Sequence, residues 1–303
     1  MTTTLRIVSW NIEDLGRHLA LPAASPRKPR AARKEMPPLA ETVARLGNPD
    51  VLCLQEVRVR PGDELALRVL GERLPDYRAA WSVCDDPRNV TFRGGRMYGV
   101  ITLVKRELAS VALPRSTFDR EGRLVFVELS DLSLCVGNVY AVNGTSKPYF
   151  DHDLGRVSGT RHELKRRFIE FLAADARALR DRGLALVLVG DWNVSRTELD
   201  TYPRLRTEEP HATARRAFND DFIPGLELVD VFRHLNPEAR RYTWFNRLTP
   251  PGKLDAARVD FALISASLLD RVVEADILDG EEFRAGSDHA PLTLTLRAPA
   301  QRK

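Results

Sequence analysis

The sequence predicts an α/β domain in which β-sheets pack inside flanking helices. Three observations support this prediction. The chain has 303 residues, of which 43% are hydrophobic, and no repeat or linker divides it. Predicted strands outnumber predicted helices and alternate with them irregularly. Several predicted strands end in a polar residue followed by a loop, which is where ligand sites gather in α/β folds.

The N-terminal half begins with two strands that each end in a polar residue. A strand over 5–10 ends at Asn11, and a strand over 50–56 ends at Glu56. Between them, residues 17–38 are rich in Pro, Ala, Arg and Lys and predict a long basic loop. The other elements expected in this half are helices over 39–46 and near 62–74, and strands over 77–83, 98–105, 123–130 and 132–142.

The C-terminal half begins with a loop expected over 143–160, where turn-forming residues are frequent. Helical periodicity follows over 161–181, with one apolar face made of Leu164, Phe168, Phe171, Leu172, Ala176 and Leu179. The remaining predicted elements are a strand over 184–190, a helical or irregular stretch over 197–224, short strands over 242–245 and 258–265, and a last strand over 290–297.

Composition limits the cellular setting. The formal net charge of +4 is compatible with a polyanionic partner without requiring one. No apolar stretch approaches the roughly 20 residues needed to cross a bilayer, and the first residues do not resemble a secretory signal. Three cysteines without a spacing pattern do not suggest disulfides. We therefore expect a cytoplasmic monomer with no membrane partner.

The stretch GDWN (190–193) ends one of the most apolar predicted strands. Residues two apart in a strand point to the same side, so Asp191 and Asn193 are expected to face one cleft while Trp192 packs away from it. A simple turn explains these residue types equally well. The same pattern recurs at other strand ends, however, in Asn11, Glu56, Tyr140, Asn143, Asp260, Asp288 and His289.

Carboxylates and amides are hard oxygen ligands that suit Mg²⁺ or Mn²⁺. The sequence has no Cys/His cluster at zinc spacing, no phosphate-binding GxxxxGK[ST] loop, no GxSxG elbow and no GxGxxG after a strand. Acidic residues, a histidine and a basic chain together indicate metal-assisted hydrolysis of a phosphoester. Singly, each residue has an ordinary explanation, such as a helix-start acid for Glu56 or a surface position for His289.

The ordered set of motifs resembles the endonuclease/exonuclease/phosphatase superfamily. The motifs are SWNIEDLGR (9–17), LQEVR (54–58), VYAVNG (139–144), GDWNVSRTELD (190–200), RVDF (258–261) and SDHAPL (287–292). The sequence is most similar to the exonuclease III-type apurinic/apyrimidinic (AP) endonuclease branch, with YTWF (242–245) ahead of RVDF. The resemblance implies a DNase I-like fold, a four-layered α/β sandwich of two mixed β-sheets packed face to face with helices outside.

The resemblance also implies a metal site for Mg²⁺, with Mn²⁺ able to substitute. Glu56 would be the principal ligand, with Asn11 beside it and Asp288 completing the site. Glu13 stands where many relatives carry Asp or Asn, and it is expected to approach the metal directly or through water.

The implied catalytic residues surround a phosphate. Asp191 would orient or deprotonate the attacking water, and Asn193 would hold a phosphate oxygen or Asp191 itself. His289 would contact the phosphate, with its tautomer fixed by Asp260. Tyr140 would donate a hydrogen bond to a phosphate oxygen. The sequence leaves open whether Asp191 or His289 is the base.

The expected substrate-binding residues are less strongly marked. Asn143 belongs to the Tyr-x-x-Asn pair. Ala257 stands where some relatives place a tryptophan that lines the sugar pocket, and Trp244 and Phe245 are expected to supply that wall instead, with ordinary core or loop packing as the alternative. Arg161 and Lys147 are candidates for contact with DNA, although a solvated helix face is the commoner explanation. The basic segment 27–34 is equally consistent with contact to DNA phosphates and with a solvated insertion.

The function expected from the resemblance is Mg²⁺-dependent DNA repair. The enzyme would cut the phosphodiester 5′ to an abasic site in double-stranded DNA, with possible 3′→5′ exonuclease or 3′-phosphodiesterase activity on 3′-blocked ends. A phosphatase or phosphodiesterase for a small molecule, a lipid head group or RNA on the same scaffold stays open, because loops set substrate choice. A non-catalytic DNA-binding protein is the third alternative.

Overall fold

The structure is a computed structural model that describes residues 4–19, 38–58, 64–86, 88–89, 98–250 and 252–298. Residues 20–37 of the predicted basic loop, including 27–34, lie outside the described residues. No helix within the described ranges is both long and apolar enough to cross a membrane.

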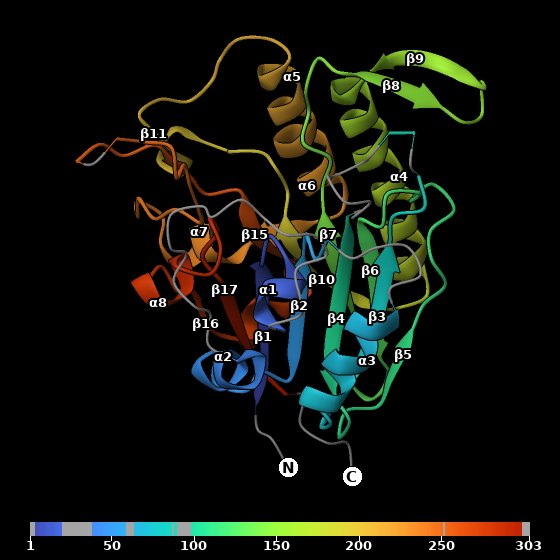
Figure 1. The fold of residues 1–303 in the computed structure, drawn as a ribbon, viewed down its shortest axis with the longest axis vertical. Coiled ribbons are helices and arrows are strands. Elements are labelled where there is room, and N and C mark those ends of the chain that lie inside the picture. Colours follow the sequence, from blue (N-terminus) through green and yellow to red (C-terminus); the bar gives the residue numbers. More distant parts are fainter. Residues whose placement is uncertain are drawn as a thin grey trace.

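Two six-stranded sheets form the centre of the molecule (Figure 1). The first has the order β16 (Val272–Ile277), β17 (Leu292–Arg297), β1 (Thr4–Asn11), β2 (Val51–Gln55), β4 (Gly99–Lys105) and β3 (Tyr77–Val83). The second has the order β12 (Leu228–Asp230), β15 (Asp260–Ser265), β10 (Ala185–Asp191), β7 (Leu134–Tyr140), β6 (Leu124–Leu129) and β5 (Ser110–Ala112). Each sheet is mixed, because β1 pairs in parallel with β2 and β7 pairs in parallel with β10, while the neighbouring pairs are antiparallel.

The alternation of side chains along the strands produces four layers. In β1, Ile7 packs in a core shared by both sheets, whereas Trp10 packs with α1 (Leu15–His18), α2 (Leu39–Arg45) and α3 (Glu64–Arg73). In β10, Val187 belongs to the shared core, and Leu188 packs with α4 (Arg161–Asp181) and the segment that holds α5 (His211–Arg216) and α6 (Ile223–Gly225). The predicted helix–sheet–sheet–helix sandwich is therefore confirmed.

A buried polar contact joins the two sheets. Gln55 Nε2 of β2 donates to Asn138 Oδ1 of β7 at 2.8 Å and to Ser9 Oγ at 3.0 Å. Asn138 Nδ2 in turn donates to Ile101 O at 2.9 Å and lies 3.2 Å from Thr102 Oγ1. Buried polar groups require such partners, so this network constrains how one sheet sits on the other.

Several elements differ from the expectations. The loop expected over 143–160 contains a hairpin of β8 (Pro148–Asp151) and β9 (Arg156–Thr160), whose turn includes Gly155 at a φ of 64°. Phe171 is 43% exposed and stacks on Phe118, so it does not belong to the buried face of α4. The sequence analysis also missed short elements, namely β5, β11 (Thr201–Tyr202), β12, α7 (Val231–Leu235), β14 (Ala256–Ala257), β16 and α8 (Glu281–Arg284).

The strand register places the predicted polar residues at one edge. Asn11 lies opposite Gln55 where β1 and β2 end, so Glu56 follows directly beside it. Asp191 lies opposite Tyr140 on one side and Asp260 on the other. These residues therefore meet although they are far apart in the sequence.

Candidate active site

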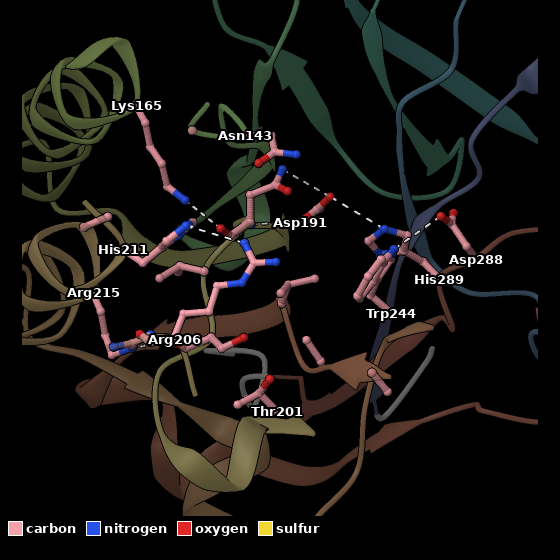
Figure 2. Close-up of a pocket in the computed structure, with 18 of the residues that line it drawn as sticks. Asn143, Lys165, Asp191, Thr201, Arg206, His211, Arg215, Trp244, Asp288 and His289 are labelled. Carbon is pink, nitrogen blue, oxygen red and sulfur yellow. Dashed lines mark hydrogen bonds and ion pairs between the residues drawn. The ribbon is translucent and has the colours of Figure 1, made fainter. Parts of the chain in front are cut away.

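A cavity of about 680 Å³ opens at this edge of the two sheets (Figure 2). Many of the side chains that line this cavity are polar or charged. The residues from the sequence analysis that line it are Glu56, Tyr140, Asn143, Asp191, Asn193, Trp244, Asp288 and His289. Asn11 and Asp260 lie directly behind this lining, where they hydrogen-bond Asp191 and His289 respectively.

His289 is held between two carboxylates. Its Nδ1 lies 2.8 Å from Asp260 Oδ2, and its Nε2 lies 3.9 Å from Asp191 Oδ2. Burial on its own would lower the pKa of His289, but Asp260 and then Asp191 raise this pKa to about 10. The imidazole is therefore positively charged at neutral pH and presents a proton toward the cavity.

The backbone of His289 is held by Trp10 of the first motif, by Ser287 and by Trp244. Trp10 Nε1 donates to His289 O at 2.9 Å, and His289 N donates to Ser287 Oγ at 3.1 Å. Trp244 pairs with His289 in an isolated antiparallel bridge, and its indole Nε1 donates to Asp288 Oδ2 at 3.3 Å. Trp10 is thus a positioning residue that the sequence analysis did not single out.

Glu56 and Asp191 converge on one amide. Asn11 Nδ2 lies 3.2 Å from Glu56 Oε2 and 3.0 Å from Asp191 Oδ2. Asp191 is 2% exposed, and burial raises its pKa to about 7, an effect that His289 opposes and Asp260 strengthens. Two carboxylates this close, bridged by a neutral amide, form an environment that a cation would stabilise.

The turn after β10 brings Asp191 and Asn193 together, as predicted, but by a different geometry. The strand ends at Asp191, and Asn193 adopts a φ of 52°. Its backbone N–H donates to Asp191 Oδ1 at 2.9 Å, and its Nδ2 donates to Ala141 O at 2.9 Å. Trp192 is fully buried against Phe218, which confirms its structural role.

Tyr140 lies at the base of the cavity. It is buried, its ring stacks edge-on with Tyr98 at 5.2 Å, and the Arg123 guanidinium lies 4.6 Å from its centre. Burial and then Glu56 raise the pKa of Tyr140 well above 10. The phenol therefore stays protonated and can serve as a hydrogen-bond donor.

Two further predicted site residues, Glu13 and Phe245, lie outside the cavity lining. Glu13 accepts from Arg247 Nη1 at 2.7 Å and from Arg17 Nη1 at 3.4 Å, so its carboxylate is engaged by surface arginines. Phe245 packs against the core between the sheets, with the Arg284 guanidinium 4.7 Å from its ring centre. The predicted sugar-pocket wall is therefore limited to Trp244.

Arg161 does not face the surface as expected. It is 8% exposed, and its Nη2 lies 2.7 Å from Glu121 Oε2 in a buried ion pair at the start of α4. Arg161 is therefore paired with Glu121 in the interior and is not a surface cation, and its contact with DNA stays a prediction. Lys147 is exposed outside the cavity lining, and its DNA contact stays a prediction.

Arg58 is a cavity residue that the sequence analysis missed. Its Nε donates to Glu56 Oε1 at 2.9 Å. Four residues in or near the cavity have positive φ values between 47° and 61°, namely Glu13, Glu56, Arg58 and Asn193. Such sparsely populated backbone conformations cluster at functional sites. The position of Arg58 two residues after Glu56 in LQEVR was the available signal.

One group of side chains in the described residues meets the distance requirement for a metal ion. It consists of Asp191, Asp260 and His289, whose ligand atoms lie within 4.8 Å of one another. The short Asp260–His289 hydrogen bond and the raised pKa of His289 instead favour a proton-bearing pair. Glu56, Asn11 and Asp288 offer oxygen donors nearby.

The profile of the Endonuclease/Exonuclease/phosphatase family matches residues 8–289. The chain belongs to this family. Because endonucleases, exonucleases and phosphatases all hydrolyse phosphoesters, membership confirms the predicted enzyme class, a phosphoester hydrolase.

The similarity to the exonuclease III-type AP endonuclease branch is also confirmed. The chain is 27% identical to exodeoxyribonuclease III of Haemophilus influenzae over 271 residues, which cover 83% of this chain and 91% of that protein. It is 25% identical to a DNA-(apurinic or apyrimidinic site) endonuclease of Dictyostelium discoideum over 82% of this chain and 63% of that protein. An AP endonuclease structure from Archaeoglobus fulgidus shares the fold with a TM-score of 0.67 at 22% identity, over 96% of this chain and 99% of that one.

Proposed function

We propose that this protein is a Mg²⁺-dependent DNA repair nuclease that cuts the phosphodiester 5′ to an abasic site. The observation that carries the proposal is the position of Asp191, which contacts Asn11 beside Glu56 on one side and lies 3.9 Å from His289 on the other. A potential metal site and a charged imidazole thus flank one carboxylate in a single cavity. The Haemophilus and Dictyostelium relatives, named as enzymes of DNA, support DNA as the substrate.

The residues present fit a magnesium ion. Glu56 and Asp191 approach the same amide nitrogen of Asn11, and their carboxylates offer the hard oxygen donors that magnesium prefers. Arg58 pairs with Glu56 through Oε1, and His289 lies on the far side of Asp191. Glu56 would be the main ligand, with the Asn11 amide and Asp288 as further candidates. A bound magnesium ion would polarise the phosphoryl oxygens and stabilise the leaving oxygen. Manganese has the same ligand preference and is expected to substitute.

The pKa shifts of His289 and Asp191 support Asp191 as the base in this proposal. His289 is protonated at neutral pH, so it is suited to donate to a phosphoryl oxygen rather than to accept a proton. Asp191, whose pKa is raised to about 7, is suited to take the proton of an attacking water. Asn193 would hold Asp191 in place, and Tyr140 would donate to the phosphate, which stabilises charge that develops in the transition state.

The substrate side of the cavity has an aromatic and an amide group. Trp244 would pack against the abasic sugar, and Asn143, which is exposed at the cavity rim, would contact a phosphate. The name of the Haemophilus relative favours 3′→5′ exonuclease as a second activity at the same site. The described cysteines Cys53, Cys84 and Cys135 are buried and free, which is consistent with a reducing environment such as the cytoplasm.

The decisive experiment uses a labelled DNA duplex with one central tetrahydrofuran abasic mimic. It is compared with an undamaged duplex in magnesium and in EDTA, for the wild type and for Asp191→Asn. We expect magnesium-dependent cleavage immediately 5′ of the mimic that the substitution abolishes. Shortening of both duplexes from the 3′ end would favour the exonuclease. A folded protein that cuts neither duplex would overturn the DNA-repair proposal.

A further inference from the structure

The cavity has a second wall made of basic side chains. We call it the cationic wall, and it consists of His162, Lys165, Arg206, His211 and Arg215. These residues come from the first turns of α4, from α5 and from the segment that precedes α5. Figure 2 shows Lys165, Arg206, His211 and Arg215 on one side of Asp191, whereas Trp244, Asp288 and His289 lie on the other. The proposed catalytic groups occupy only one end of the cavity.

Lys165 and Arg215 of the cationic wall are oriented by carbonyl groups. Lys165 Nζ donates to Asn193 O at 2.6 Å, directly behind the proposed catalytic turn. Arg215 Nε donates to Ser195 O at 2.8 Å, and its Nη2 donates to Arg206 O at 2.7 Å. These contacts fix the positions of the cations without neutralising them, because a carbonyl carries no net charge.

The histidines complete the wall. The His162 and His211 rings meet edge to face with centres 5.7 Å apart, and Arg206 Nη1 lies 3.5 Å from His211 Nε2. Among the residues that the structure describes, Lys165, Arg206 and Arg215 form no ion pair within 4 Å. Three carboxylates act on this wall by charge: Asp191 on Lys165, Glu163 on His162, and the exposed Glu208 on His211 and Arg215.

The electrostatics agree with this geometry. Burial lowers the pKa of Lys165 to about 8. Burial and then neighbouring cations lower the pKa of both histidines, through Lys165 for His162 and through Arg206 for His211. The lowered pKa values leave the two histidines mostly neutral at neutral pH, so Lys165, Arg206 and Arg215 carry the positive charge that faces the cavity. Such a group of cations forms a favourable site for an anion. Arg and Lys side chains in such a site typically bind phosphate.

We infer that the cationic wall binds a second phosphate of the substrate, next to the phosphate that is cleaved. The ligand chemistry is a phosphate anion, which has two possible sources: the neighbouring phosphodiester of a continuous strand, or a terminal phosphomonoester at a strand end. This inference rests on the proposed function, because the cleaved phosphate is placed between Asp191 and His289. It adds a subsite that makes a substrate with two phosphates bind better than one with a single phosphate.

The test measures DNA binding separately from cleavage. A fluorescent duplex with the abasic mimic is prepared with a neutral methylphosphonate at the linkage on either side of the cleaved one. A separate strand end carries a terminal phosphate or a hydroxyl. Fluorescence anisotropy, with calcium in place of magnesium, gives the Kd for the wild type, for the double variant Arg206→Gln/His211→Gln, and for Arg216→Gln. Arg216 is a matched control, because it lies on α5 outside the cavity lining and pairs with Glu209 at 2.9 Å.

We expect one phosphate to matter only when the cationic wall is intact. Removing the charge of that DNA phosphate should raise the Kd of the wild type and of Arg216→Gln by about tenfold, as for a hydrogen bond between charged groups. The same change should raise the Kd of the double variant by less than twofold. The phosphate that shows this coupling identifies the source. An equal loss in all three proteins at every position would overturn the inference. Because binding is measured without turnover, this result is independent of whether the abasic duplex is cut in magnesium.

Discussion

The Nδ1 atom of His289 lies 2.8 Å from Oδ2 of Asp260, and both side chains are buried. Asp260 begins β15 beside Asp191 on β10, while His289 precedes β17 in the other sheet. The pair therefore bridges the two sheets at the cavity edge. Its geometry fixes which imidazole nitrogen faces the cavity, because the other nitrogen is held by the carboxylate.

Asp260→Asn should remove most of the activity. An amide cannot stabilise the imidazolium as a carboxylate does, so we expect kcat to fall by about 10²- to 10⁴-fold with little change in KM. Steady-state cleavage of the abasic duplex measures this. Asp255→Asn is the control, since Asp255 lines the same cavity but hydrogen-bonds Asn246 at 2.7 Å instead of His289. Equal losses in the two variants would contradict a specific role for Asp260.

Trp10→Phe should lower the activity although Trp10 does not line the cavity. The change removes the 2.9 Å hydrogen bond from the indole to His289 O while keeping an aromatic ring in the core. We expect kcat to decrease by about tenfold and the free energy of unfolding to decrease by about 1 kcal/mol. Trp192→Phe provides the comparison, because the Trp192 indole N–H is buried with no hydrogen-bond partner among the described residues. If both variants lose the same activity at the same stability, Trp10 has only a packing role.

The candidate site residues could be predicted because polar residues recur at the ends of several apolar strands, whereas any single one of them has an ordinary structural explanation. Asn11, Glu56, Tyr140 and Asp191 stand at such ends, and parallel pairing brings those ends to one edge. The long, strongly apolar strands were also predictable. Short edge strands such as β12 were not, since three residues carry too little periodicity to be distinguished from a loop.

The misassigned residues depended on tertiary partners. Arg161 looked like a surface cation, but its partner Glu121 is 40 positions away and draws it into the interior. Phe245 and Trp244 are neighbours in one short strand, so they point to opposite sides and only one can line the cavity. The cationic wall could not be predicted from the sequence for the same reason. Lys165 and Arg215 line one cavity only because α4 and α5 pack together.

Glu56→Gln should change the metal requirement more than the fold. Replacing a carboxylate by an amide removes the charge that a divalent cation needs, so we expect the magnesium concentration for half-maximal activity to rise at least tenfold. Titration of cleavage rate against magnesium measures this. The corresponding change at Glu13, which is bound to Arg247 outside the cavity lining, should shift the midpoint much less. A larger shift for Glu13→Gln would move the proposed metal site toward Glu13.

Gly190→Ala should disrupt the sheet that carries Asp191. A Cβ at this position would lie 1.8 Å from Val139 O on β7, and the φ of 144° is unfavourable for other residues. We expect a loss of at least about 3 kcal/mol in the free energy of unfolding, or failure to fold. Gly183→Ala has the same backbone preference, with a φ of 84°, but no atom within 4 Å, so its cost should be about 1 kcal/mol. Equal costs in denaturant titrations would show that the close approach to β7 is not the cause.

His18 should make folding sensitive to acid. It packs edge-on against Trp10 with ring centres 5.2 Å apart, and burial followed by Arg17 lowers its pKa from 6.5 to about 4. Between these values the unfolded chain binds a proton that the folded chain does not, so this contribution to stability is present above pH 6.5 and is lost as pH falls toward 4. His18→Phe keeps the aromatic contact but cannot titrate. From pH 7 to pH 4, the variant should therefore gain about 3 kcal/mol relative to the wild type in denaturant titrations. If the difference in the free energy of unfolding between the two proteins stays the same across this range, the pKa of His18 is not lowered in the folded state. His234→Gln, at an exposed position, serves as the control for loss of a histidine elsewhere.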